Sequence, residues 1–290
     1  MSTTAPVPSD ATLSERQREA LISLLADEDP AVYQTVRAKL LAFGPVAGDW
    51  LRPHTLSGDP ALRRRALEIV HHLSREEADE RFFRFCHRRG DDLDFEEGAW
   101  LLAQTQYPEF NIEAYRALID SYAAELREHV HAASHPEATL LTINQYLFQR
   151  LGFMGNARNY YDPDNSYLNR VVDHRLGNPI SLCAVYLMVT RRLGLPITGI
   201  GLPGHFLCRY QSSTYEMYID CFHLGRLLTK TDCIRHLVQN QCSLQDGHLT
   251  PMTPRQMLLR MCRNLHQIYL HHELSEETAR FARYLTALGK

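Results

Sequence analysis

Hydrophobic residues recur at helical spacing along most of the chain and gather into short continuous runs beyond its middle. A stripe of Leu21, Leu24 and Leu25 begins the helical part. Further amphipathic segments predict helices over 75–89, 94–104, 112–131 and 136–149. Short apolar runs between turn residues predict strands over 197–200, 206–210 and 215–222. Helical spacing returns over 252–271 and 279–285. The pattern indicates an α+β fold.

One segment differs from the others because almost all of its residues are apolar. Residues 180–189 read ISLCAVYLMV, a composition typical of a helix buried on most sides. Asn178 can cap its first turn, and Pro179 suits the first helical position, where no amide hydrogen is needed. Gly194 and Pro196 end it.

Three candidate catalytic residues follow one another in this region, namely Cys183, His205 and Asp220. A thiol, an imidazole and a carboxylate are the components of a nucleophile, a general base and an orienting group. A loop centred on residues 211–214 predicts that His205 stands directly opposite Asp220 in an antiparallel hairpin. The start of a helix lowers the pKa of a nearby thiol, which would favour a reactive Cys183.

Several segments together resemble the SirB1-type transglutaminase-like proteins. The similar segments are 93–103 (LDFEEGAWLLA), 107–115 (YPEFNIEAY), 165–182 (NSYLNRVVDHRLGNPISL), 191–196 (RRLGLP), 201–207 (GLPGHFL), 219–220 (ID) with Phe222, 225–228 (GRLL) and 253–255 (TPR). The resemblance extends over roughly residues 40–275. It implies a papain-related core in which a nucleophile helix packs on an antiparallel sheet that carries His205 and Asp220. Tetratricopeptide-like helices at the C-terminus are common in such proteins.

The role of Cys183 has two alternatives. In active transglutaminase-like cores the cysteine stands at the very start of the helix, which corresponds to Pro179 or Ile180 in this chain. Cys183 lies one turn deeper on the same helix face, so it either points at the site or fills a buried position as a small apolar residue. The family also tends to have proline and glycine where this chain has Cys221 and Leu224.

Four further residues are candidates for lining the site, namely Asn178, Ser181, Tyr161 and Arg209. Metal binding is the main rival chemistry, since Cys208, Cys221, His205 and His223 are close in sequence. His205 and Cys208 should face opposite sides of their strand, which argues against one site made of these four. We therefore expect no metal and no cofactor.

The chain is expected to comprise a flexible tail (1–12), a helical region (13–155), a transglutaminase-like core (156–250) and a C-terminal helical hairpin (251–290). Within the helical region, Asp-Pro pairs at 29–30 and 59–60 predict two helix starts. The fold class is thus α+β, with the N-terminal helical region packed on the core and a tetratricopeptide-like hairpin behind it.

Composition narrows the class of protein. The formal net charge is −3 and hydrophobic residues make up 44% of the 290, which gives no general indication of nucleic-acid binding. We expect no membrane association, because no apolar run is long enough to span a bilayer. Seven cysteines without close pairing favour a reducing cytoplasm.

Two function classes remain open on the sequence. One is a regulatory or binding protein, with little or no activity, that keeps a His–Asp pair and contacts a protein or peptide partner. The other is a cysteine-dependent amide hydrolase or acyltransferase that uses Cys183, His205 and Asp220. The oligomeric state does not follow from the sequence. Labelling of Cys183 in the native protein distinguishes the two classes, and we expect it to require unfolding.

Overall fold

A computed structural model describes residues 13–88, 93–130, 135–239 and 249–290. The chain divides into two compact units, Met1–Asp79 and Glu80–Lys290. The tail expected over 1–12 lies outside the described residues. No helix in the described ranges is long and apolar enough to cross a membrane.

The first unit is helical. It contains α1 (Glu15–Ser23), η1 (Leu24–Ala26), α2 (Pro30–Ala42), α3 (Pro45–Leu51), η2 (Arg52–Leu56) and most of α4 (Pro60–Cys86). Two helices begin at the Asp-Pro pairs, as the sequence predicts. The side chain of Asp29 accepts from the amide of Ala31, and that of Asp59 from the amide of Ala61. These caps satisfy amides that have no partner within the helix. The core of this unit includes Leu25, Leu40, Leu51 and Ile69.

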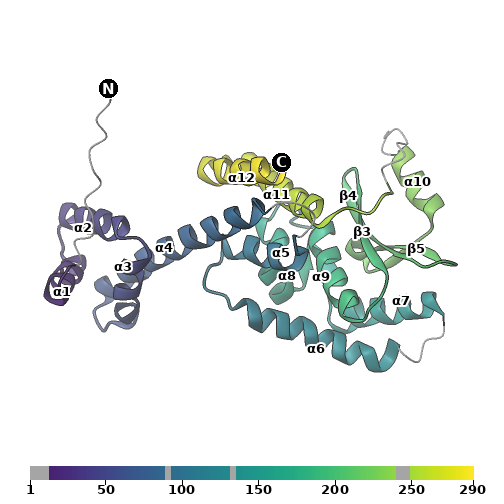
Figure 1. Ribbon diagram of the computed structural model, residues 1–290, viewed down its shortest axis with the longest axis horizontal. Coiled ribbons are helices and arrows are strands. Elements are labelled where there is room, and N and C mark those ends of the chain that lie inside the picture. Colours follow the sequence, from purple (N-terminus) through teal and green to yellow (C-terminus); the bar gives the residue numbers. More distant parts are fainter. Residues whose placement is uncertain (1–12, 89–92, 131–134, 240–248) are drawn as a thin grey trace. The chain divides into compact units, whose positions relative to one another are not determined.

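The second unit begins with helices that precede the sheet in sequence. They are α5 (Phe95–Gln104), α6 (Ile112–Val130), α7 (Pro136–Asn144) with its π-helical continuation η3 (Gln145–Arg150), η4 (Pro163–Ser166), α8 (Leu168–His174) and α9 (Pro179–Arg192). After the sheet come α10 (Lys230–Gln239), α11 (Pro254–His271) and α12 (Ser275–Leu288). Figure 1 shows α11 and α12 side by side as the expected C-terminal hairpin.

The second unit contains an antiparallel sheet of four strands. Its order is β3 (Ile197–Leu202), β4 (His205–Gln211), β5 (Glu216–Asp220) and β6 (Arg226–Leu228), with η5 (Cys221–His223) before β6. A separate parallel pair joins β1 (Met154–Gly155) to β2 (Leu176–Gly177). Helices and a small antiparallel sheet in one unit confirm the predicted α+β class.

The two faces of the sheet pack on different helices. Phe206, Cys208 and Ile219 belong to the large core that contains α9. The residues that alternate with them, such as Leu207 and Tyr218, pack with Cys233 and Leu237 of α10. Figure 1 shows α9 and α10 around the strands. Side chains alternate across a strand, so neighbouring residues of β4 lie in different chemical surroundings.

The register of the β4–β5 hairpin corrects one prediction. Cys208 pairs with Ile219 and Tyr210 with Met217, and the amide of Ser212 donates to the carbonyl of Tyr215. The turn is therefore centred on residues 213–214, one position later than expected. His205 and Asp220 are diagonal neighbours and not directly opposite. A shift of two in the register leaves them on the same face, because the side-chain period of a strand is two.

The core of the second unit depends on helices that precede residue 156. Trp100, Leu126 and Leu147 are fully or almost fully buried in the same core as α9. We expect a fragment of residues 80–290 to be soluble and to unfold cooperatively, and a fragment of residues 156–290 to lack a cooperative transition. Thermal unfolding followed by circular dichroism tests both fragments. A sharp melt of the shorter one would show that the core does not need α5–α7.

Candidate functional site

His205 is placed by a tight turn at the start of β4. Leu202 pairs with His205 across a two-residue connection of Pro203 and Gly204, and Gly204 has φ of 70°. Proline followed by glycine with positive φ is the pattern of a type II turn, in which other residues are strained at the second position. The imidazole therefore projects from a defined strand end toward the face that α10 covers.

Asp220 ends β5 and lies between two imidazoles. Its Oδ2 atom is 2.9 Å from Nε2 of His205 and 2.8 Å from Nδ1 of His223. Its Oδ1 atom accepts a hydrogen bond of 3.2 Å from the amide of His223. The predicted pairing of His205 with Asp220 across adjacent antiparallel strands is confirmed.

The loop after Asp220 brings His223 back to the carboxylate. Residues 221–223 form a short 3-10 turn, and Leu224 and Gly225 follow with φ of 57° and 74°. Leu224 thus occupies a left-handed conformation that usually favours glycine. A Cβ atom on Gly225 would stand 2.5 Å from Cγ of Asn144, so this position requires glycine.

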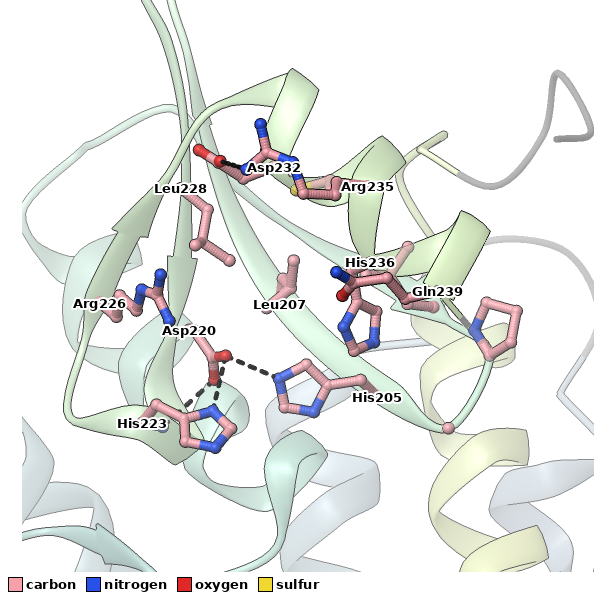
Figure 2. A pocket seen from close by; sticks show the side chains of 14 residues that line it. His205, Leu207, Asp220, His223, Arg226, Leu228, Asp232, Arg235, His236 and Gln239 are labelled. Atoms are coloured by element: carbon pink, nitrogen blue, oxygen red, sulfur yellow. Dashed lines mark hydrogen bonds and ion pairs between the residues drawn. The ribbon is translucent and has the colours of Figure 1, made fainter. Parts of the chain in front are cut away.

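The His205–Asp220 pair lies in the wall of a pocket of about 440 Å³ between the strands and α10 (Figure 2). The lining residues are Leu202, Pro203, Gly204, His205, Leu207, Asp220, His223, Arg226, Leu228, Asp232, Cys233, Arg235, His236 and Gln239. The side chains of His205 and Asp220 are 11% and 8% exposed, whereas that of His223 is 63% exposed. The pocket therefore combines a mostly buried His205–Asp220 pair with His223, whose side chain is accessible to solvent.

The charge state of Asp220 follows from its neighbours. Burial alone raises the pKa of Asp220, but the contacts with His205 and His223 outweigh it and hold the pKa below its usual value. The carboxylate is therefore ionised at neutral pH and can hold imidazole N–H groups or a cation.

Cys183 lies on the opposite face of the sheet from this pocket. Its side chain is completely buried, and its Sγ atom donates to the carbonyl of Phe206 at 3.6 Å. The sulfurs of Cys183, Cys208 and Cys221 lie within 4.8 Å of one another. Within the ranges given above, no hydrogen bond joins Cys183 to His205. The geometry does not bring the predicted triad together.

The three thiols differ in acidity. Burial raises the pKa of Cys208 and Cys221 well above the usual value. Burial also opposes ionisation of Cys183, but its two thiol neighbours and His205 outweigh it and lower the pKa of Cys183 below its usual value. Reactivity also needs access to solvent, which Cys183 lacks.

The other candidate residues lie outside the pocket. Asn178 and Ser181 are buried in a reciprocal cap at the start of α9, and the hydroxyl of Ser181 donates to the carbonyl of Asn165 at 2.6 Å. Tyr161 is exposed, with its ring centroid 5.7 Å from that of His271. Arg209 is on the same face of β4 as His205 but about 13 Å further along the strand, where it donates to the carbonyl of Leu249. Of the seven proposed positions, the pocket thus includes His205 and Asp220.

Sequence reasoning did not include three of the polar lining residues in the site, namely His223, Arg226 and His236. In the sequence, His223 belongs only to the four-residue metal set that the alternation of side chains along the strand argues against. The available signal was its spacing of three residues from Asp220, because an aspartate that caps a turn is close to the third residue after it. Arg226 and His236 carried no comparable signal, since their positions depend on the path of β6 and α10.

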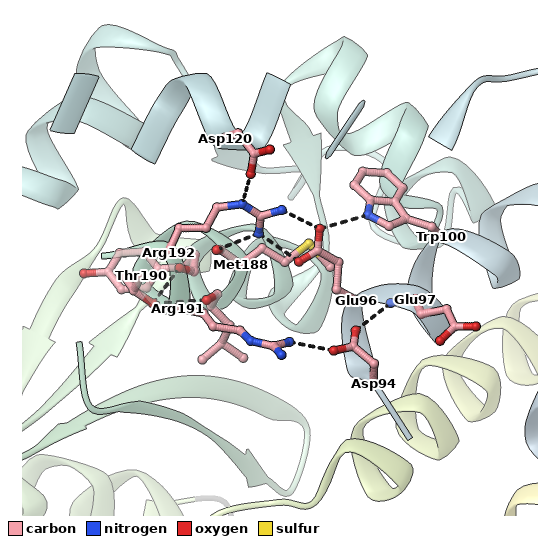
Figure 3. A network of polar contacts seen from close by, with 11 residues as sticks. Asp94, Glu96, Glu97, Trp100, Asp120, Met188, Thr190, Arg191 and Arg192 are labelled. Atoms are coloured by element: carbon pink, nitrogen blue, oxygen red, sulfur yellow. Dashed lines mark hydrogen bonds and ion pairs between the residues drawn. The ribbon is translucent and has the colours of Figure 1, made fainter. Parts of the chain in front are cut away.

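The far end of α9 is held by an ionic network (Figure 3). Arg192 donates to both carboxylate oxygens of Glu96 at 2.8 Å and also contacts Asp120. The hydrogen bonds with Glu96 raise the pKa of Arg192 above its usual value. The indole of Trp100 also donates to Glu96. The network joins α5, α6 and α9, and so fixes the helix that packs under the sheet.

Comparison with known proteins agrees with this architecture. Residues 113–263 match the family described as the transglutaminase-like superfamily, and the chain belongs to it. It is 39% identical over 191 residues to a UPF0162 protein of Xylella fastidiosa strain 9a5c. The aligned stretch covers 63% of this chain and 68% of that protein. A UPF0162 protein of Pseudomonas aeruginosa is 26% identical over 181 residues, covering 60% and 64% of the two chains.

A shorter similarity extends to a eukaryotic protein. The chain is 38% identical over 99 residues to F-box only protein 21 of Mus musculus, which covers 31% of this chain and 16% of that protein. No solved structure matches the chain.

The network around Arg192 gives a prediction about stability. In Arg192→Met we expect a loss of about 2–4 kcal/mol in the free energy of unfolding, because the buried carboxylate of Glu96 loses its partner. Arg191→Met is the matched control, since Arg191 is 67% exposed in its pair with Asp94 and should change stability by less than about 0.5 kcal/mol. Urea unfolding measures both variants. Equal effects of the two substitutions would contradict a structural role for the network.

Proposed function

We propose that this chain is a SirB1-type binding or regulatory protein that recognises a protein or peptide partner through the pocket at His205 and Asp220, without thiol-dependent acyl transfer. The observation that carries the proposal is the separation of Cys183 from His205 by the β-sheet. A general base must reach the proton that it removes, either directly or through one water molecule. The sulfur donates instead to the carbonyl of Phe206.

The chemistry of the pocket supports recognition. Imidazole, carboxylate and guanidinium groups converge on one face together with Leu207 and Leu228. A few oriented polar groups on an apolar wall are typical of ligand sites. The similarity to a stretch that makes up 16% of F-box only protein 21 also suits a recognition module that is reused in larger proteins.

The second candidate is a cysteine-dependent amide hydrolase or acyltransferase, and the lowered pKa of Cys183 favours it. The thiolate would attack the carbonyl carbon of an amide, His205 would give a proton to the leaving amine, and the acyl group would pass to water or to another amine. This sequence of steps requires a rearrangement that moves Cys183 to the pocket side of β4.

The proposal places the protein in the cytoplasm. The cysteines that the structure describes are Cys86, Cys183, Cys208, Cys221, Cys233 and Cys262, and all six are free thiols. Free buried thiols suit a reducing compartment.

Thiol labelling separates the two candidates. We expect iodoacetamide to modify Cys183 in the native protein about 1,000-fold more slowly than an exposed cysteine, because access requires an opening that costs about 4 kcal/mol. Ser213→Cys, in the exposed β4–β5 turn, supplies the exposed reference within the same chain. Peptide mass spectrometry measures each site separately.

One labelling result would contradict the binding proposal. Rapid labelling of Cys183 in the folded protein, lost in His205→Ala, would replace the binding proposal with the acyl-transfer mechanism. Labelling that accelerates only at urea concentrations that unfold the chain supports the binding proposal.

A further inference from the structure

We propose that His205, Asp220 and His223 form a binding site for a divalent transition-metal cation of the Zn²⁺ class. One ligand atom from each of these residues lies within 4.8 Å of the other two. The site is part of the pocket assigned above to recognition, and the inference rests on that assignment in one respect: His205 must not be required as the base of a thiol.

The distances between the proposed ligand atoms would change only slightly when a cation binds. Oδ2 of Asp220 is 2.9 Å from Nε2 of His205 and 2.8 Å from Nδ1 of His223. In a tetrahedral site with metal–ligand distances of about 2.0–2.1 Å, neighbouring ligand atoms are about 3.3 Å apart. Oδ2 of Asp220 would therefore move away from each of the two nitrogens by roughly half an ångström as a cation enters the site. The amide of His223 keeps Oδ1 occupied, which orients the carboxylate.

An unsatisfied nitrogen gives an independent indication. Nε2 of His205 is buried and has no directed hydrogen bond, although it is close to Asp220. Its contact with Oδ2 of Asp220, at 2.9 Å, is an ion pair and does not meet the geometry of a hydrogen bond. A buried polar atom without an aligned partner is costly, and coordination would remove that cost.

The donor set selects the kind of cation. Two imidazoles and one carboxylate suit Zn²⁺ and its first-row neighbours, whereas Ca²⁺ and Mg²⁺ prefer a shell of oxygen ligands. Arg226 lines the same pocket and places a positive charge near the single carboxylate. Cation binding at this site would therefore depend on the nitrogen ligands and not on an excess of negative charge. The thiols of the opposite face do not contribute, since β4 separates them from the imidazoles.

All three proposed ligand residues line the pocket, so the fourth position of a tetrahedral site would face it. Figure 2 shows His236 beside His205, and the two ring centroids are 5.9 Å apart. Three protein ligands with one open position are typical of zinc sites that bind a water molecule or a group of a ligand. The cation would thus present a binding position to a partner that enters the pocket.

Titration of the full-length protein with Co²⁺ after chelator treatment, followed by displacement with Zn²⁺, tests this proposal. We expect one equivalent to bind with visible ligand-field bands and without a sulfur-to-cobalt charge-transfer band. His223→Ala should weaken binding at least about 100-fold, since even loss of a residue that only supports a ligand costs 10–100-fold. His129→Ala, which removes an exposed histidine of α6, is the matched control and should bind like the unaltered chain.

Three outcomes would overturn the site. One is the absence of saturable binding, and another is unchanged affinity in both His205→Ala and His223→Ala. The third is a charge-transfer band that disappears in Cys208→Ser, which would place the cation at the three thiols. A thermal melt of His223→Ala that matches the unaltered chain excludes misfolding as the cause of lost binding. The first two outcomes leave the labelling rate of Cys183 unchanged, so the cation site can fail while the binding proposal stands.

Discussion

The burial of α9 is the constraint on which the rest of the second unit depends. The helix contacts β3 and β4 on one side and α6 and α8 on others, and nearly all of its residues are buried. A buried helix must satisfy the polar groups at both ends. The cap formed by Asn178 and Ser181 does so at the start, and Arg192 extends to Glu96 and Asp120 at the end. These contacts hold α9 against the sheet from which the pocket is built.

Because α9 covers one face of the sheet, the sulfur chemistry and the imidazole chemistry of this chain are separated. Cys183 belongs to the apolar layer between α9 and the strands. His205 and Asp220 belong to the layer between the strands and α10, which is open to solvent. The His205–Asp220 pair thus lines a pocket that the three thiols do not enter. Both proposals, recognition through the pocket and a cation bound in it, depend on this separation.

Local sequence features, such as helix caps and prolines, predicted more of this architecture than features that depend on contacts between distant residues. Caps and prolines mark helix starts within a few residues, so the starts at Pro30 and Pro179 followed from the sequence. The hairpin register did not, because the loop after Gln211 lacks glycine and leaves its centre open. The side that Cys183 faces was also undetermined, since a helix that is apolar all round has no polar face to orient it. His223 joined the site only through the turn after Asp220.

The thiol layer has a consequence for how the hairpin folds. The β4–β5 turn specifies its own register weakly, so the faces of the strands must select it. A slip by one residue would insert the Asp220 carboxylate among Cys183 and Cys208, where an unpaired charge costs several kcal/mol. A slip by two keeps every side chain on its proper face. The buried sulfurs therefore disfavour register shifts by an odd number of residues, whereas they do not discriminate against shifts by an even number.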